Sequence, residues 1–184
     1  MKSKVLVTSN WKEFKLEDLF EILTPQQKFN AIDIVDFNGK YPYVVRSKTN
    51  NGIKGYINQK EEFLNQANTI SFGQDTATMF YQNQPYFTGD KIKILVFKEQ
   101  ELNIKFNDNL ALFLIPILNK AFQNFNWGSS SYNINILKKI VFHLPKNSKN
   151  QIDWQFMEES IKQTKQEMQN IINIYKLLAN GGGY

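Results

Sequence analysis

The chain contains no cysteine, a single histidine and no long apolar run. Without cysteine it can form neither a disulfide framework nor a thiolate zinc site, and a reducing cytoplasm is the expected compartment. No run of about eighteen uncharged apolar residues occurs, which predicts that the chain does not span a membrane. Residues 1–8 lack the apolar centre of a signal peptide. The chain has 184 residues, 42% of them hydrophobic, which suffices for one domain with a packed core and an additional helix.

The sequence also lacks the patterns that assemble a catalyst. His143 lies in an apolar segment before Pro145, where a structural role is expected for its imidazole. The run from Gly52 to Gly55 is too short for a phosphate-binding loop. Magnesium-dependent nucleases need clustered carboxylates, but Glu13 has no acidic residue upstream to complete its acid-x-Lys triplet. We therefore expect a binding protein with no catalytic residue, no metal site and no cofactor.

Arginine occurs only once, at Arg46, although the chain has 22 basic residues against 17 acidic ones. The formal net charge is +5, and because the charges over residues 154–178 cancel and Asp153 is acidic, residues 1–152 carry an excess of six positive charges. A basic globular part favours a polyanionic partner such as nucleic acid. An AT-rich genome would also produce the abundance of Lys, Asn, Ile and Phe, so the charge leaves both explanations open.

Hydrophobic alternation and turn residues predict the α+β class, with a mixed β-sheet domain, flanking helices and a long C-terminal coiled-coil helix. Residues 11–22 are expected to form a strand and then a short amphipathic helix, and residues 25–39 a strand that ends at the turn pair Asn38-Gly39. A buried helix is expected over residues 109–125, capped by Asp108. Further strands are expected at residues 41–46, 53–57, 69–72, 77–81, 92–97 and 136–144, with turns at 73–76 and 85–90.

Residues 151–184 are the second predicted unit, a helix with a Gly-rich end that follows a domain of residues 1–150. Its apolar positions recur at alternating gaps of three and four residues, which is the pattern of a coiled coil. Asp153 is the expected N-cap, and residues 154–178 would span about 37 Å. No second heptad segment occurs, so the seam is expected to pair with another chain; packing on its own domain is the alternative. The seam consists of Trp154, Met157, Ile161, Thr164, Met168, Ile171, Tyr175 and Leu178.

Polar loops between the predicted strands supply the candidate DNA contacts. The densest loop runs from Arg46 to Gly55 and combines one guanidinium, two ammonium groups and side-chain amides. Arginine can bind guanine, and asparagine or glutamine can bind adenine, through paired hydrogen bonds, whereas lysine mainly contacts phosphate. An ion pair of Arg46, a plain turn at residues 50–52 and a linker turn at residues 127–132 are the alternatives. The candidates are Arg46, Ser47, Lys48, Asn50, Asn51, Lys54, Gln74, Thr76, Gln82 and, from a Gly/Ser/aromatic loop at 127–133, Ser129, Ser130 and Tyr132.

The order of short motifs along the chain resembles the target recognition domain of the specificity subunits of type I restriction-modification systems, and of related type II systems with separate S subunits. Each motif is weak by itself, and their order over residues 11–178 is what makes the resemblance specific. The motifs are Trp11-Lys12-Glu13-Phe14, Leu19-Phe20, Tyr41-Pro42-Tyr43-Val44, Asn50-Asn51-Gly52-Ile53, Asn68-Thr69-Ile70-Ser71-Phe72-Gly73, Tyr86-Phe87-Thr88-Gly89-Asp90, Ala111-Leu112-Phe113-Leu114, Leu137-Lys138, Leu144-Pro145 and the segment from Ile152 to Glu158.

The resemblance implies a non-catalytic subunit that reads a sequence of double-stranded DNA, followed by one spacer helix. Full-length family members carry two such units whose helices pair antiparallel, so this chain is similar to one half. The implied partners are therefore a homodimer mate or a second specificity half, a DNA methyltransferase subunit and, in many systems, a restriction subunit. Two other readings remain: a standalone DNA nuclease or methyltransferase domain, and a coiled-coil nucleic-acid-binding adaptor. The target sequence does not follow from the resemblance, because base contacts vary within the family.

Overall fold

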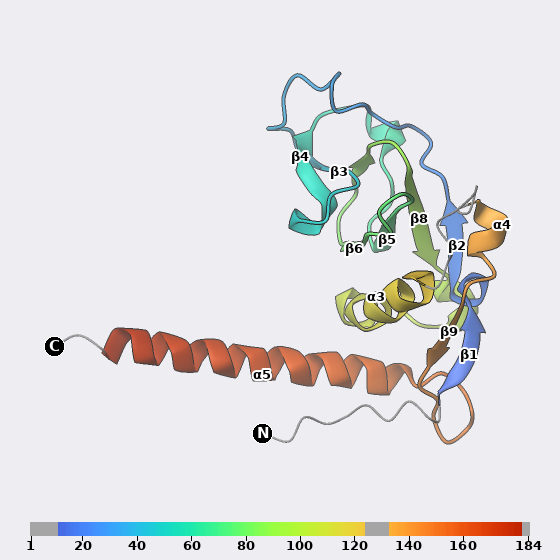
Figure 1. The fold of residues 1–184 in the computed structure, drawn as a ribbon, viewed down its shortest axis with the longest axis vertical. Coiled ribbons are helices and arrows are strands. Elements are labelled where there is room, and N and C mark those ends of the chain that lie inside the picture. The colour runs from blue at the N-terminus through green and yellow to red at the C-terminus, as the bar shows by residue number, and fades with distance from the viewer. Residues whose placement is uncertain (1–10, 124–132, 182–184) are drawn as a thin grey trace.

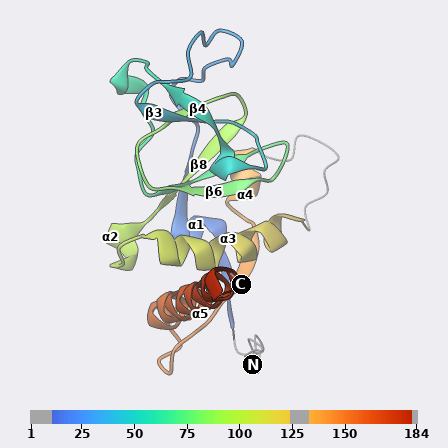
Figure 2. The same ribbon diagram turned by 90° about the vertical axis from the view of Figure 1, so that its left-hand side faces the viewer.

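The structure is a computed structural model that describes residues 11–123 and 133–181 (Figure 1). Strands and helices pack into a domain from which one long helix extends, and the predicted α+β class is confirmed. Figure 2 shows the layers in order: the sheet of β3 and β4 lies outermost, then the sheet of β6 and β8, then α3, and finally α5. No helix within the described ranges is long and apolar enough to cross a membrane.

The described strands form three sheets. The largest has the order β2-β8-β5-β6 and is antiparallel throughout. In the second, of order β4-β3-β7, β3 pairs antiparallel with β4 and parallel with β7. The third is the antiparallel pair β1-β9. The strands are β1 (Lys12–Lys15), β2 (Phe20–Leu23), β3 (Tyr41–Val44), β4 (Ile53–Ile57), β5 (Thr69–Gly73), β6 (Met79–Gln82), β7 (Phe87–Thr88), β8 (Ile92–Phe97) and β9 (Val141–Leu144).

The two longest helices, α3 and α5, cross at the base of the domain (Figures 1 and 2). The predicted cap of α5 is confirmed, since Asp153 Oδ1 accepts a hydrogen bond from Phe156 N at 3.0 Å. The predicted cap of α3 is wrong by one residue, because Asn107 Oδ1 accepts from Asn109 N at 3.0 Å. The helical segments are α1 (Leu16–Leu19), α2 (Glu99–Leu102), α3 (Asp108–Gln123), α4 (Ile134–Leu137), α5 (Trp154–Gly181) and the 3-10 turns η1 (Asn50–Gly52) and η2 (Glu61–Phe63).

Two hydrophobic cores support these elements. The main core lies between the four-stranded sheet, α3 and the start of α5, and it includes edge-to-face ring pairs such as Phe72 with Phe122. The smaller core lies under the three-stranded sheet and is centred on Tyr43, Ile57 and Phe87. The smaller core therefore supports the polar loop after β3 and the segment around residues 29–37, away from α5.

Two sequence predictions of strands are wrong. Residues 25–39 form no strand; they cross the surface as coil, making one isolated bridge from Asn38 to Tyr56, and their apolar side chains pack on the smaller core. Residues 136–140 are not extended, because the side chain of Asn133 caps α4 and only residues 141–144 form β9. The predicted turn at residues 85–90 contains the short strand β7, and residues 99–102 form the helix α2.

Candidate nucleic-acid interface

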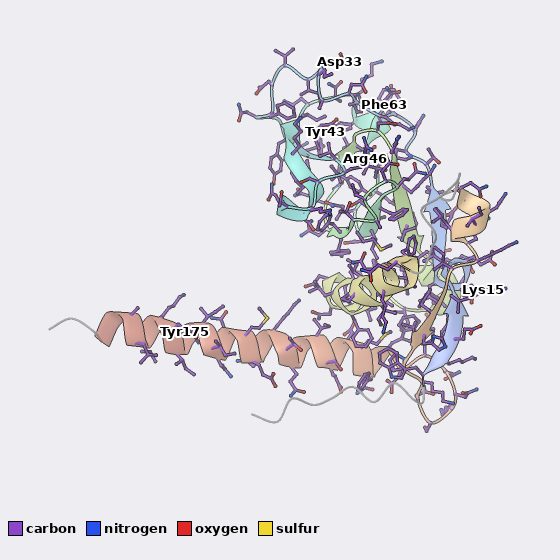
Figure 3. The ribbon with its side chains drawn as sticks, in the orientation of Figure 1. Lys15, Asp33, Tyr43, Arg46, Phe63 and Tyr175 are labelled. Atoms are coloured by element: carbon purple, nitrogen blue, oxygen red, sulfur yellow. The ribbon has the colours of Figure 1, made fainter. Side chains whose placement is uncertain are left out.

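Arg46 lies just after β3, and its guanidinium is not isolated. Arg46 Nη1 donates a hydrogen bond to Asp75 Oδ2, and Lys91 Nζ donates to the same carboxylate oxygen at 2.8 Å. The hydrogen bond from Lys91, assisted by the charge of Arg46, lowers the pKa of Asp75 below its ordinary value. The ion pair considered as an alternative for Arg46 is therefore present. Figure 3 shows Arg46 near Tyr43, in the part of the domain farthest from α5.

The loop after Arg46 is held by hydrogen bonds of its own side chains. Ser47 Oγ accepts from Thr49 N at 3.2 Å. Asn50 and Asn51 both adopt left-handed backbone angles, with φ of 50° and 54°. Their amide groups donate within the protein, Asn50 Nδ2 to Ile53 O at 2.8 Å and Asn51 Nδ2 to Tyr81 O at 2.9 Å. The turn expected as an alternative at residues 50–52 is thus formed, and both asparagines remain exposed at the surface.

Gln82 is the candidate that the structure removes from the DNA face. Its side chain lies inside the sheet and the residue is only 2% exposed. Gln82 Nε2 donates to Asn51 O at 3.0 Å and to Ser71 Oγ at 3.1 Å. The prediction that Gln82 contacts DNA is wrong on this geometry, because strand β6 turns this side chain inward and its amide is bound to protein.

Four of the remaining described candidates line one open pocket of about 600 Å³. These are Arg46, Ser47, Lys54 and Thr76, and Tyr43 and residues 29–33 also line the pocket. Thr76 Oγ1 is 2.9 Å from Thr78 Oγ1. Gln74 occupies the same β5–β6 turn as Thr76, with its backbone N–H bonded to Lys91 O at 2.9 Å. The structure therefore brings segments from three parts of the sequence together on one face.

The two lysines of the loop differ in their surroundings. Lys54 Nζ lies 5.5 Å from the centre of the Phe37 ring, a distance suited to a cation–π contact. Lys48 is exposed and forms no ion pair with any residue of the described ranges. Lys48 can therefore approach a phosphate without first breaking an ion pair. Ser129, Ser130 and Tyr132 lie outside the described residues.

Sequence reasoning missed several members of this face. Asp75 was treated only as a turn residue, Lys91 was not singled out, and the pocket wall of residues 29–33 was expected in a strand. Lys28 was missed as well, and its Nζ forms an ion pair at 3.4 Å with Oδ1 of Asp90, which lines the pocket. A lone arginine in a lysine-rich chain signals that a planar, fork-shaped donor is needed, but it does not reveal the partner. That partner is 29 positions away in sequence.

No group of three or more His, Cys, Asp or Glu side chains within residues 11–123 and 133–181 is arranged to hold a metal ion. Burial and the neighbouring charge of Lys28 lower the pKa of Lys93, in β8. The described part of the face can thus offer hydrogen-bond donors and positive charge to a ligand.

The long helix presents a second candidate surface, and its eight seam positions divide into two sets. Met157 is 0% exposed, and Trp154 and Ile161 pack against the main core of the same chain. A partner helix cannot contact Met157, so the predicted seam is wrong at that position and the alternative of packing on the same domain holds for this first set. From residue 162 to residue 179 every position of α5 is exposed. The second set is Thr164, Met168, Ile171, Tyr175 and Leu178.

Comparison with known proteins places the chain in a family. Residues 8–174 match the family described as the Type I restriction modification DNA specificity domain. The chain is 26% identical over 168 residues to a curated protein of Heyndrickxia coagulans named "Type II restriction enzyme BgcI specificity subunit S.BcgI", covering 89% of this chain and 46% of that protein. The chain therefore belongs to the DNA specificity domain family of restriction-modification systems, and the predicted resemblance is confirmed.

Solved structures share the fold. The S subunit of a type I restriction-modification system from M. genitalium aligns with a TM-score of 0.52 and 15% identity, over 92% of this chain and 45% of that one. The HsdS subunit from Thermoanaerobacter tengcongensis aligns with a TM-score of 0.53 and 12% identity, over 95% and 42%. A structure of a type I R-M system, whose title concerns complex assembly, aligns at 0.56 and 11%, over 98% and 44%. The chain spans less than half the length of each of these relatives.

Proposed function

We propose that this chain reads a specific sequence in double-stranded DNA for a restriction-modification system and leaves the chemistry to partner subunits. The observation that carries the proposal is the family match, which extends over residues 8–174 and therefore includes both the pocket face and most of α5. The excess of basic residues in the chain agrees with a phosphate-rich ligand.

The proposed DNA surface is the face around the pocket, made by Arg46, Ser47, Lys48, Lys54 and Thr76. Arg46 and Thr76 offer donors at the pocket, where base edges can be contacted, while Lys48 is placed to contact backbone phosphate. Asn50, Asn51 and Gln74 flank this surface and complete its rim. Because the amides of both asparagines donate within the protein, we assign these two residues mainly to loop shape.

The proposed pairing surface is the second set of seam positions on α5, beginning at Thr164. Met168 is 58% exposed, Ile171 42%, Tyr175 70% and Leu178 68%, which leaves an apolar stripe uncovered along a helix that extends from the domain (Figure 3). Covering such a stripe is favourable by about 25 cal/mol per Å² of apolar area. We infer that the same stripe of a second copy, or of a second specificity half, packs against this one, because the relatives are about twice as long as this chain.

The proposed partners beyond DNA are a DNA methyltransferase subunit and a restriction subunit, acting in the cytoplasm. This division of labour follows from the family and from the absence, within the described ranges, of a metal-binding acidic cluster. The chain itself would then bind DNA without cutting or methylating it.

A selection from a random duplex pool, using the purified chain, tests the proposal. We expect enrichment of one sequence motif, and we expect no cleavage with Mg²⁺ and no methyl transfer from S-adenosylmethionine. Cleavage or methylation that disappears with a point substitution in this chain would show that it is an enzyme. Equal affinity for duplex DNA and RNA of the same length would instead favour the adaptor reading.

A further inference from the structure

Three segments that are far apart in sequence converge on one carboxylate oxygen. Arg46 follows β3, Asp75 lies in the turn between β5 and β6, and Lys91 immediately precedes β8. Arg46 Nη1 and Lys91 Nζ both donate to Asp75 Oδ2, the second at 2.8 Å. Asp75 therefore fixes one end of the guanidinium of Arg46, while Lys91 fixes Asp75.

The turn that carries Asp75 is braced on both sides. Gly73 N donates to Thr78 O at 2.9 Å, which closes the turn, and Gln74 N donates to Lys91 O at 2.9 Å, which ties the turn to the start of β8. A Cβ atom on Gly73 would lie 2.7 Å from Thr76 Oγ1, so a larger residue at this position would displace that hydroxyl. The same Cβ would be 3.4 Å from Arg46 Cγ, which shows how closely the turn approaches the stem of Arg46.

Arg46 keeps donors for a ligand after this contact. Its hydrogen bond to Asp75 uses Nη1, and no other residue in the described ranges accepts a hydrogen bond from its Nη2 or Nε. The Arg46 side chain is 35% exposed and lines the pocket. A guanidinium anchored at one nitrogen still presents a pair of parallel donors, which matches the O6 and N7 acceptors of guanine in the major groove.

We propose that Arg46 and Asp75 form a preorganised guanine-reading pair, in which Arg46 contacts the base and Asp75 is a positioning residue. This inference rests on the proposed function and adds to it one base identity and the residue that enforces it. Holding the guanidinium in place before binding removes side-chain freedom that would otherwise be lost on binding. The contact with Asp75 also adds discrimination against other bases. A guanidinium that is held in place cannot move aside, so its donors stay unpaired when the base lacks the two acceptors of guanine.

Replacement of Asp75 by asparagine tests the pair, because it removes the charge and keeps the shape. The measurement is base preference at every position, from selection on a random duplex pool, together with affinity for a random duplex. We expect Asp75→Asn to lower the preference for one G·C pair by about tenfold. Affinity for random duplex should stay equal or rise, because a negative charge near phosphate is lost.

The matched control is Asp90→Asn. Asp90 lines the same pocket and pairs with Lys28 at 3.4 Å, so its replacement removes the same charge at a similar place without touching Arg46. We expect Asp90→Asn to leave all base preferences unchanged. Arg46→Lys should lose preference at the same G·C pair as Asp75→Asn, and the double variant should lose no more than Arg46→Lys alone.

The outcomes distinguish failure of the guanine-reading pair from failure of the proposed DNA-reading function. An unmutated chain that selects no motif overturns both. A motif that survives Asp75→Asn at every position, or that weakens equally with Asp90→Asn, overturns the guanine-reading pair alone. Lys91→Gln provides a second variant, expected to give a smaller loss at the same position. Thermal unfolding of each variant, with transitions like that of the unmutated chain, confirms that a loss arises in the folded protein.

Discussion

Gln82 holds the loop after Arg46 onto the central sheet. Its amide donates to Asn51 O at 3.0 Å and to Ser71 Oγ at 3.1 Å, and Asn51 Nδ2 donates in return to Tyr81 O at 2.9 Å. The loop is therefore tied to β6 through both its backbone and a side chain. Asn51 can take part because its left-handed φ of 54° is one that asparagine tolerates better than most residues.

Replacing Gln82 by alanine should therefore destabilise the fold. The change removes a buried amide and takes the donor away from Asn51 O and from the buried Ser71 Oγ, so we expect the free energy of unfolding to fall by about 1–3 kcal/mol. Gln84→Ala is the control, because Gln84 is an exposed neighbour in the same polar run, and its effect should stay within about 0.5 kcal/mol. Urea unfolding measures both values. Unchanged stability of Gln82→Ala with weaker DNA binding would return Gln82 to the DNA surface.

The role of a single residue was predictable from the sequence where its chemistry is unusual, and less so where the backbone decides in which direction its side chain points. Arg46 stands out as the only arginine, and the structure places it at the pocket. The polar run at residues 81–84 does not show which of its side chains points into the protein, because side chains of a strand alternate between its two faces. The strand was also predicted to begin at residue 77, two residues before the observed start of β6. Its register follows from pairing with β5, where Ser71 offers the acceptor for Gln82.

At the scale of elements, polar contacts join α3 to α5. Asn107 Nδ2 donates to Glu158 Oε1 at 2.6 Å, and Lys165 Nζ donates to Asp108 Oδ2 at 2.5 Å and to Asn109 Oδ1 at 2.6 Å. Lys165 lies beyond the buried start of α5, so its contacts extend the attachment of the helix by about one turn past Ile161. These contacts help to fix the direction in which α5 leaves the domain.

The Lys165 contact should make stability depend on pH. The hydrogen bond from Lys165 lowers the pKa of Asp108 in the folded state, and that from Asn107 lowers the pKa of Glu158. A carboxyl group whose pKa is lower in the folded protein than in the unfolded chain stabilises the fold. This stabilisation is complete at a pH above the pKa in the unfolded chain, about 4, and it is lost as the pH falls through the pKa in the folded protein.

We therefore expect Lys165→Met to reduce stability at pH 7, with a difference from the unmutated chain that shrinks as the pH falls below about 4. The control is Lys149→Met, at an exposed lysine that forms no ion pair within the described ranges. Denaturant unfolding across this pH range gives the comparison. A constant difference between Lys165→Met and the unmutated chain from pH 7 to pH 3 would contradict the role given to Asp108.

The two sets of seam positions on α5 should respond oppositely to a buried charge. Ile171 is exposed in the single chain, so Ile171→Glu should give a folded monomer, because a carboxylate in a paired seam costs several kcal/mol. Ile161 packs on the main core, so Ile161→Glu should instead destabilise the domain. Light scattering and thermal unfolding distinguish the two effects.

The control for the pairing surface is Asn170→Glu, which adds the same charge on α5 outside the seam and should leave the dimer intact. A chain that is monomeric at tens of micromolar before any substitution contradicts self-pairing. In that case a second specificity half is the remaining candidate to pack against the apolar stripe of α5.

Elements were predictable where pattern and cap agree. The strands at residues 41–44, 53–57, 69–73 and 92–97 and the helices α3 and α5 lie where alternation or helical spacing predicted them. The segment 25–39 has strand-like composition, but the structure gives it no sheet partner, and its apolar residues instead cover the smaller core. The segment 134–140 is rich in β-branched residues, yet the cap by Asn133 and burial of Leu137 and Ile140 favour a helical turn. The cap by Asn133 is local, but the cover of the smaller core and the burial of Leu137 and Ile140 are tertiary contacts that local patterns do not contain.

At the scale of the whole molecule, two copies paired through α5 would be related by a twofold axis. Such a pair presents identical reading surfaces in opposite orientations, so a homodimer should prefer an inverted repeat with an unread gap. The helix has 28 residues, or about 42 Å, which is comparable to one duplex turn of roughly 34–36 Å. Half-site centres should therefore lie on the order of ten base pairs apart.

Lengthening α5 tests whether it acts as a ruler. Repeating residues 167–173 once adds one heptad, which keeps the seam in register and separates the domains by about 10 Å, or roughly three base pairs. Three base pairs also rotate the second half-site by about a third of a turn, so one added heptad should weaken binding to every inverted repeat. Three added heptads, about 31 Å, approach a full duplex turn and should restore tight binding with a gap longer by nine or ten base pairs. Selection from random duplex pools, run for each helix length, measures the gap, and the half-site sequence serves as the internal control because it should not change. A gap that ignores helix length would show that α5 pairs the domains without setting their distance on DNA, and a single asymmetric site would contradict a twofold pair on DNA.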